Sequence, residues 1–359
     1  MAFCFGENVR YRLFGQGDSE YIGMVIEGLP AGEYIDPYDV REFVGRCSLG
    51  RKTSFFGGGS LREVQFLSGV MEYRTCGTPV CAVMANDSKV SEPTETESEG
   101  LLPPSESEIV RWLQGGAGAA SENGDIWHEG IPAALCIGGV IAKKLLEKRN
   151  IVVGVHIESI GSIHDRPFDP VRVTPEELKD PGRYPFPTLN YSVGETMQAQ
   201  IDLTAKRGDS IGGVVECGIT GLPGGLGDPL FHGLSGALAA NLFALPGVAG
   251  VEFGDGFRSA MQKGSGQKTA LRGKDGRLCT EKNGCGGVLW GVSTGMPLIL
   301  RVAMRPSMEI PGEWETFDPV GGEGAVLTTK RHQPCFVPQL VPVVESVLAM
   351  TLLDRIMVK

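Results

Sequence analysis

The sequence predicts an α+β fold in which layers of strands and helices form two similar halves. Strand and helix patterns follow one another in the same order in each half, and the turn "IEGLPAG" at 26–32 is echoed by "ITGLPGG" at 219–225. Glycine supplies 52 of the 359 residues, about twice its usual share, without a collagen-like period. This content indicates many tight turns and close backbone approaches. Packed layers in a single domain over 1–359 are therefore expected.

The first half begins with mixed strands and a helix. The run "YIGMVIEG" at 21–28 has the composition of a strand that ends in a Gly/Pro turn. The segment 36–46, "DPYDVREFVGR", predicts a helix capped by Asp36 with Pro37 in its first turn. The alternating stretch at 63–85 predicts two paired strands.

An acidic segment interrupts this pattern. Residues 87–108, "DSKVSEPTETESEGLLPPSESE", carry one lysine among many glutamates and serines. Such a composition buries little apolar surface, so we expect a mobile loop over 87–124. A partner-binding segment is the alternative interpretation.

A further helix and strand precede the second half. A helix with one apolar face is expected over 130–149, followed by a buried strand at 151–163. His156 lies inside that apolar run, which favours a core histidine with satisfied hydrogen bonds over a ligand. The second half then repeats the order with a strand–helix–strand unit over 210–257, two strands over 283–307 and an amphipathic helix over 339–357.

Charge and composition exclude several classes of function. The net charge of −10 opposes binding to nucleic acid or to an anionic membrane, although a local basic pocket could still take a small anionic ligand. We expect no transmembrane helix and no secretory signal, and hence a cytoplasmic protein. The nine cysteines are scattered and odd in number, which predicts free thiols. Five scattered histidines do not predict a metal site.

Several stretches together carry a resemblance to a known family. In their order and spacing they resemble chorismate synthases over nearly the whole chain. The stretches are "FGENVRYRLFG" (5–15), "FLSGVMEYRTCGTPV" (66–80), the glycine-rich segment 207–257, "GGVLWGVSTGMPLILRVAMRPSMEIP" (286–311) and "KRHQPCFVPQLVPVVESVLAMTLLDRI" (330–356).

The resemblance implies a β-α-β sandwich of two pseudo-repeated halves that assembles as a homotetramer. It also implies a lyase of aromatic amino acid biosynthesis, in the shikimate pathway. The family reaction is the anti-1,4-elimination of phosphate from 5-enolpyruvylshikimate 3-phosphate to chorismate, with reduced FMN as cofactor. A substrate with two carboxylates and a phosphate requires several arginines, and its proton transfers require histidines.

The family's catalytic motifs are altered in this chain. "FGQGDS" at 14–19 places Asp18 at the first histidine, and "LPPSES" at 102–107 places Ser105 at the second. Gln333 replaces the aspartate base of the RHDPC motif, and an amide cannot accept a proton at neutral pH.

The altered motifs also affect the binding positions. In "RCSLG" Arg46 is kept while Cys47 and Ser48 replace two arginines, and "NGDIWHEGIP" at 123–132 lacks both arginines of its motif. The resemblance also implies a turn near the flavin, in which Trp290 stands where the family has a glycine. The resemblance leaves Arg46, Arg331 and His332 for substrate, and Gly286, Gly287, Arg305 and Ser307 for the cofactor.

Three functions fit this pattern. The joint loss of histidines, base and arginines favours a non-catalytic or repurposed paralogue, a pseudoenzyme that acts as a binding or assembly protein. The alternatives are a working chorismate synthase with substitute residues, and a different flavin- or anion-binding enzyme on the same scaffold. Fold-level analogy does not separate these two, whereas a yellow purified protein would indicate a retained flavin.

Overall fold

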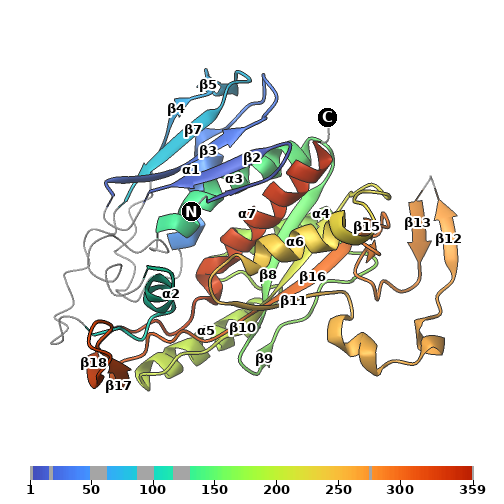
Figure 1. Cartoon of the computed structure of the whole chain (residues 1–359). Coiled ribbons are helices and arrows are strands. Elements are labelled where there is room, and N and C mark those ends of the chain that lie inside the picture. Colours follow the sequence, from blue (N-terminus) through green and yellow to red (C-terminus); the bar gives the residue numbers. More distant parts are fainter. Residues whose placement is uncertain are drawn as a thin grey trace.

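The chain folds as a three-layer sandwich. The computed structural model describes residues 3–15, 19–48, 63–86, 101–115, 130–274 and 277–357. Two five-stranded antiparallel sheets enclose a layer of helices, which confirms the expected α+β fold and its β-α-β layering (Figure 1).

The two sheets are built from successive stretches of the chain, the first from residues 4–85 and the second from residues 152–304. The order of the first is β1 (Cys4–Phe5), β2 (Arg10–Phe14), β3 (Tyr21–Glu27), β7 (Val80–Ala85) and β4 (Val64–Ser68). The order of the second is β11 (Val248–Phe253), β16 (Leu298–Met304), β10 (Gly213–Thr220), β8 (Val152–Ile160) and β9 (Ile163–His164). Four small hairpins project from this body: β5 (Val70–Met71) with β6 (Arg74–Thr75), β12 (Leu271–Lys274) with β13 (Arg277–Thr280), β14 (Val288–Leu289) with β15 (Val292–Ser293), and β17 (Gly312–Phe317) with β18 (Gly324–Thr329).

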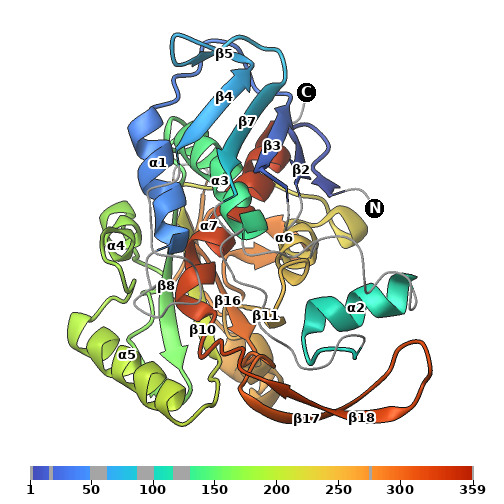
Figure 2. The ribbon, with the colours of Figure 1, turned by 90° about the vertical axis from the view of Figure 1, so that its left-hand side faces the viewer.

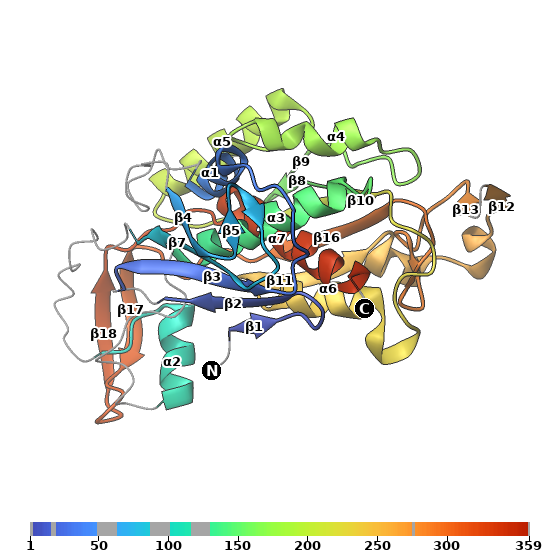
Figure 3. The same ribbon diagram turned by 90° about the horizontal axis from the view of Figure 1, so that it is seen from above.

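Helices fill the middle layer and cover the outside of the second sheet. The α-helices are α1 (Pro37–Gly45), α2 (Glu106–Gly115), α3 (Gly130–Glu147), α4 (Pro175–Lys179), α5 (Tyr191–Lys206), α6 (Leu234–Phe243) and α7 (Val337–Ile356). A 3-10 turn, η1 (Arg46–Ser48), continues α1. Helices α4 and α5 lie along β8 on the face away from α3 and α7 (Figure 3).

Most of the expected elements are confirmed. Helix α1 begins where its cap was predicted, because the Asp36 side chain accepts a hydrogen bond from the backbone N–H of Tyr38. Strands β4 and β7 pair antiparallel as expected for the stretch 63–85. The strand–helix–strand unit over 210–257 is present as β10, α6 and β11.

Helix α7 differs from the expected amphipathic helix. All but three of its 20 residues are buried, because α3, α6, η1 and strands β8 and β10 of the second sheet surround it. Its apolar length would suffice to cross a membrane, yet 89% of that apolar window is packed inside the protein. The amphipathic prediction was wrong because a middle-layer helix has no face left for solvent.

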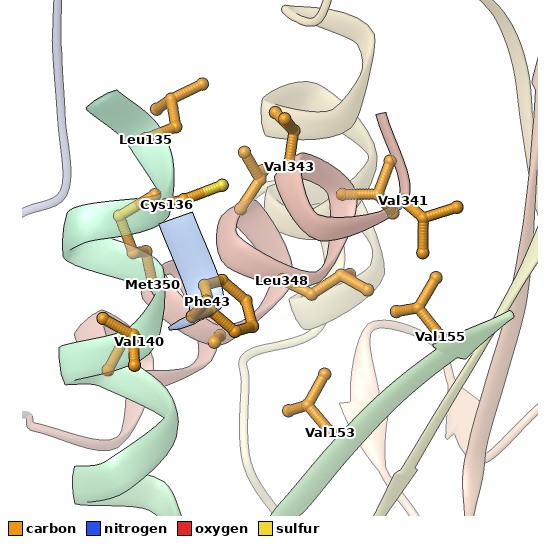
Figure 4. Packing of buried hydrophobic residues seen from close by; sticks show 14 of the residues in the cluster. Phe43, Leu135, Cys136, Val140, Val153, Val155, Val341, Val343, Leu348 and Met350 are labelled. Carbon is orange, nitrogen blue, oxygen red and sulfur yellow. The ribbon is translucent and has the colours of Figure 1, made fainter. Parts of the chain in front are cut away.

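The contact between α3 and α7 forms the centre of the core. Phe43, Cys136, Val140, Leu348 and Met350 pack together there (Figure 4). A Cβ atom on Gly139 of α3 would come within 2.0 Å of the Ser346 side chain on α7. The two helices therefore approach closely only because this position has no side chain.

The expected mobile loop over 87–124 is described only in its middle part. Residues 87–100 and 116–124 lie outside the described residues. Residues 106–115 form α2, a helix that the acidic composition did not predict. It packs beside the β17–β18 hairpin, where the rings of Trp112 and Phe317 meet edge to face at 5.1 Å (Figure 2).

The two ends of the described chain are joined. One carboxylate oxygen of Asp354, near the end of α7, accepts hydrogen bonds from the backbone N–H groups of Glu7, Asn8 and Val9. The Asn8 side chain also donates to the Asp354 carbonyl at 3.0 Å. This clasp fixes the loop between β1 and β2 to the last helix.

Candidate functional site

The second sheet brings several candidate residues to one of its ends. Strands β10 and β16 pair so that Gly213 faces Met304. The residues before β10 and after β16 therefore meet. The Ser210 hydroxyl donates to the Ser307 carbonyl at 2.7 Å, and His332 Nε2 lies 3.0 Å from the Asp209 carbonyl.

The predicted base position lies in the same network. The Gln333 backbone N–H donates to the Glu309 carbonyl at 2.8 Å, and its side chain is buried. Gln333 Nε2 donates to Gln339 Oε1 at 3.2 Å. This amide is held by protein groups and has no proton-accepting nitrogen, so it cannot serve as a base.

Two further candidates, Ser105 and Arg305, lie beside helix α2 at this end of the sheet. Ser105 precedes the helix and is buried, with its hydroxyl 3.0 Å from that of Ser107. Glu106 Oε2 accepts a hydrogen bond from Arg305 Nη2 at 2.6 Å. The charge of Arg305, expected to face a cofactor, is therefore balanced by a carboxylate of the same chain.

Arg46 belongs to a buried ion cluster. Its Nη1 donates to Glu345 Oε2 at 2.8 Å, and Lys143 of α3 binds the other oxygen of the same carboxylate. Burial by itself would raise the pKa of Glu345, but Arg46 and Lys143 more than offset this effect and hold the pKa below its ordinary value. Arg46 therefore serves an internal carboxylate.

A groove opens beside this cluster. It has a volume of about 460 Å³ and lies between α1, α3 and the turn at 182–185. Its charges are mixed: Lys144 pairs with Asp39 at 2.8 Å, while Glu147 pairs with Lys179. The groove therefore lacks the surplus of positive charge that a multiply charged anion requires.

Two predicted cofactor residues lie elsewhere. Gly286 hydrogen-bonds with Ile299, at the start of β16, whereas Arg305 follows the end of that strand. Six residues of extended chain span about 20 Å. Within one chain, Gly286 and Gly287 therefore lie at the opposite end of β16 from Arg305 and Ser307.

Packing alone explains both glycines. They have φ of +65° and +82°, and a Cβ would lie 2.4 Å from the backbone of Gly254 or Pro297, respectively. Asn283 braces this turn, because its side chain accepts from the Gly287 N–H and donates to the Pro297 carbonyl. Trp290 follows in the neighbouring hairpin and is 85% exposed.

The other candidates have different settings. Arg331 is half-buried, and its guanidinium has no ion-pair partner in the ranges that the structure covers. Asp18 lies outside the described residues. The structure therefore groups Arg305, Ser307, His332 and Gln333, together with Ser105. Arg46 belongs to a different ion cluster, whose Glu345 lies six residues after Gln339 on α7.

His156 is a core residue, as the sequence predicts. Its Nε2 lies 3.0 Å from Glu216 Oε2 on β10, and its Nδ1 is 3.7 Å from Asp165. Burial favours the neutral ring, but Asp165 and Glu216 outweigh it and raise the pKa of His156. The side chain is fully buried and serves sheet pairing.

Three carboxylates with structural partners were not predicted from the sequence: Glu345 and Glu106, which pair with arginines, and Asp354, which binds backbone N–H groups. Glu345 stands in the run "VPVVESVLAM" and Asp354 in "TLLDRI". A charged residue inside a buried apolar run is almost always paired, so these positions carried a signal. Glu106 offered no such signal because it lies in a generally acidic segment.

Comparison with known proteins places this architecture in one class. The family model described as chorismate synthase matches residues 9–357. The chain is similar to the chorismate synthase of Korarchaeum cryptofilum, with 33% identity over 354 residues covering 98% of this chain and 97% of the relative. It is 31% identical to that of Methanocella arvoryzae over 98% of this chain and 93% of the relative. A crystal structure of chorismate synthase superposes with a TM-score of 0.75 at 22% identity, covering 98% of this chain and 92% of that one. The chain belongs to the chorismate synthase family.

Proposed function

We propose that this chain keeps the chorismate synthase fold without the family's elimination reaction, and acts as a binding or assembly protein. The observation that carries the proposal is Gln333. It stands at the position of the family's base, and it is a buried amide bound to Gln339 and Glu309. A residue in this state neither removes nor returns a proton.

The charges at the site support the same proposal. Arg305 pairs with Glu106, and Arg46 pairs with Glu345. A substrate that carries two carboxylates and a phosphate would have to displace these internal partners. Each lost charged hydrogen bond costs about 1.5–3 kcal/mol, so binding would weaken by powers of ten.

Reduced FMN, the cofactor of the family, fits the described residues poorly. Arg305 is already paired with a carboxylate, and the glycines expected near the flavin are closed against protein backbone. They also lie at the far end of β16 from Ser307.

A small anion remains a suitable ligand for this end of the second sheet. Arg331 has no acidic partner in the ranges that the structure covers, and it lies next to His332 in the chain. One or two cations can hold a singly or doubly charged anion weakly. This supports a binding role.

Assembly as a homotetramer, the state that the family implies, is also proposed. Large apolar side chains are exposed on the loops after β10 and β11 and at β14–β15: Phe231, Phe257, Met261 and Trp290. Large apolar side chains that are more than 80% exposed support an interface between copies of the chain at these loops. Sedimentation should give a species larger than the 38.3 kDa chain, and a clean monomer at micromolar concentration would contradict assembly.

The experiment that tests the proposed function is an anaerobic assay with reduced FMN and 5-enolpyruvylshikimate 3-phosphate. We expect no chorismate from this protein, while a relative with intact motifs, run in parallel, forms it. Turnover of about 1 s⁻¹ or faster would show a working enzyme. A yellow protein without turnover would favour a different flavin enzyme on this scaffold.

A further inference from the structure

Two cysteines from distant parts of the chain meet beside the Arg46 cluster. Cys47 lies in η1 and Cys136 in α3, 89 positions apart, and their sulfur atoms are 3.0 Å apart. No other two of the nine cysteines, all in the described ranges, are in hydrogen-bond contact. A disulfide has a bond of about 2.05 Å, so the two sulfurs need approach by only about 1 Å.

The two thiols differ in access. Cys47 is half-buried at the end of α1, whereas Cys136 is fully buried under it. Burial raises the pKa of the Cys136 thiol well above its ordinary value, and the hydrogen bond with Cys47 adds to this effect. An oxidant would therefore meet Cys47 first, and Cys136 would act as the second thiol.

We propose that Cys47 and Cys136 are a reversible oxidation site. A peroxide or a low-molecular-weight disulfide would oxidise the two thiols to one intramolecular disulfide. With a peroxide, the Cys47 thiolate attacks one oxygen, breaks the O–O bond and becomes a sulfenic acid. The Cys136 sulfur then attacks the Cys47 sulfur, forms the S–S bond and displaces hydroxide from the sulfenic acid. The proton of the Cys136 thiol passes to this hydroxide, which leaves as water. Two thiols and one hydrogen peroxide thus give one disulfide and two waters. With a low-molecular-weight disulfide, the Cys47 thiolate displaces one small thiol to form a mixed disulfide, and the Cys136 sulfur then displaces the second small thiol. A dithiol reductant restores both thiols by exchange.

The bond would join two elements that the ion cluster already links. Arg46 precedes Cys47 and binds Glu345, while Lys143 is seven residues after Cys136 on the same helix. Oxidation would therefore fix η1 against α3 covalently, next to a groove that both elements line. Closing a loop of this length restricts the unfolded chain, so the oxidised protein should unfold at a higher temperature.

The full chain can be tested directly. The reduced protein is treated with hydrogen peroxide or oxidised glutathione, blocked with a thiol reagent, digested without reductant and analysed by mass spectrometry. We expect a peptide pair linked through Cys47 and Cys136, two fewer free thiols per chain, and a Tm that rises and returns with dithiothreitol.

Variants separate this pair from the other thiols. Cys47→Ser and Cys136→Ala should each abolish the linked peptide. Cys76→Ser is the matched control: Cys76 is exposed, and a hydrogen bond with Thr78 lowers the pKa of its thiol, so it is the natural competitor for oxidant. This variant should keep the linked peptide.

Mass spectrometry of the oxidised, unsubstituted protein identifies the linked cysteines even if a variant fails to fold. Oxidation confined to Cys76 would overturn the proposal, as would over-oxidation of Cys47 while Cys136 stays a free thiol. Linkage of Cys47 to any other cysteine would also overturn it.

Discussion

Arg46 and Glu345 form an ion pair across the core, with Nη1 and Oε2 2.8 Å apart and only 4% of the glutamate side chain exposed. Lys143 binds the same carboxylate from α3. This arrangement joins η1, α3 and α7, which are distant in sequence. It uses an arginine that the family resemblance reserves for substrate.

Breaking this cluster should destabilise the protein strongly. Arg46→Ala removes one of two cations from a buried carboxylate, and we expect the free energy of unfolding to fall by about 3 kcal/mol. Urea denaturation measures it. The matched control is Arg272→Ala, which removes the exposed pair with Glu281. That control should change stability by less than about 0.5 kcal/mol, and equal losses in both variants would contradict a structural role for Arg46.

Stability should depend on pH through His156. Burial alone would lower its pKa, but Asp165 and Glu216 raise it in the folded protein. Its proton therefore stabilises the fold fully below the unfolded-state pKa of about 6.5, and this contribution is lost as pH rises through the folded-state value. We expect His156→Asn to cost most near about pH 6 and progressively less toward about pH 9.

Urea unfolding of both proteins across this range gives the measurement. His164→Asn is the control, because His164 has a side chain that is 60% exposed. It should change stability little at every pH. A penalty for His156→Asn that increased toward alkaline pH would have the wrong sign.

Releasing Arg305 should improve anion binding. Glu106→Gln removes its carboxylate partner, and we expect inorganic phosphate to bind about 2–5-fold more tightly in calorimetric titration, the effect of an exposed pair. Glu108→Gln is the control, since Glu108 pairs with Arg111 on the same helix. An unchanged phosphate affinity in Glu106→Gln would show that Arg305 does not contribute to the anion site.

Restoring the altered catalytic positions should not restore the reaction. We expect the triple substitution Asp18→His, Ser105→His and Gln333→Asp to give no chorismate under the anaerobic assay, because Arg46 and Arg305 stay paired internally. Circular dichroism must first show that the triple variant folds. Turnover in a folded triple variant would mean that the missing arginines are unnecessary for substrate binding.

Local patterns predicted most of the fold. The cap of α1, the pairing of β4 with β7 and the core position of His156 each follow from neighbouring residues or strand periodicity. The environment of α7 does not, because only the three-layer packing decides that no face meets solvent.

The site was less predictable for a related reason. The resemblance named residues that the structure gathers at one end of the second sheet, but it did not predict the acidic partners of Arg46 and Arg305. Glu345 is 299 positions from Arg46, and Glu106 is 199 from Arg305. The glycines at 286 and 287, which the resemblance assigns to the cofactor together with Arg305 and Ser307, lie at the opposite end of β16 from these two residues. Ion pairs between residues so far apart in the sequence produce no periodic pattern from which they could be predicted.

The clasp at Asp354 has a consequence for the order of folding. A chain is synthesised from its N-terminus, so the loop at Glu7, Asn8 and Val9 emerges about 345 positions before its acceptor Asp354. The edge of the first sheet therefore has no anchor until α7 has been synthesised. Ribosome-bound chains that stop before α7 should remain open at this edge, accessible to chaperones, and close only when a chain that includes α7 has emerged.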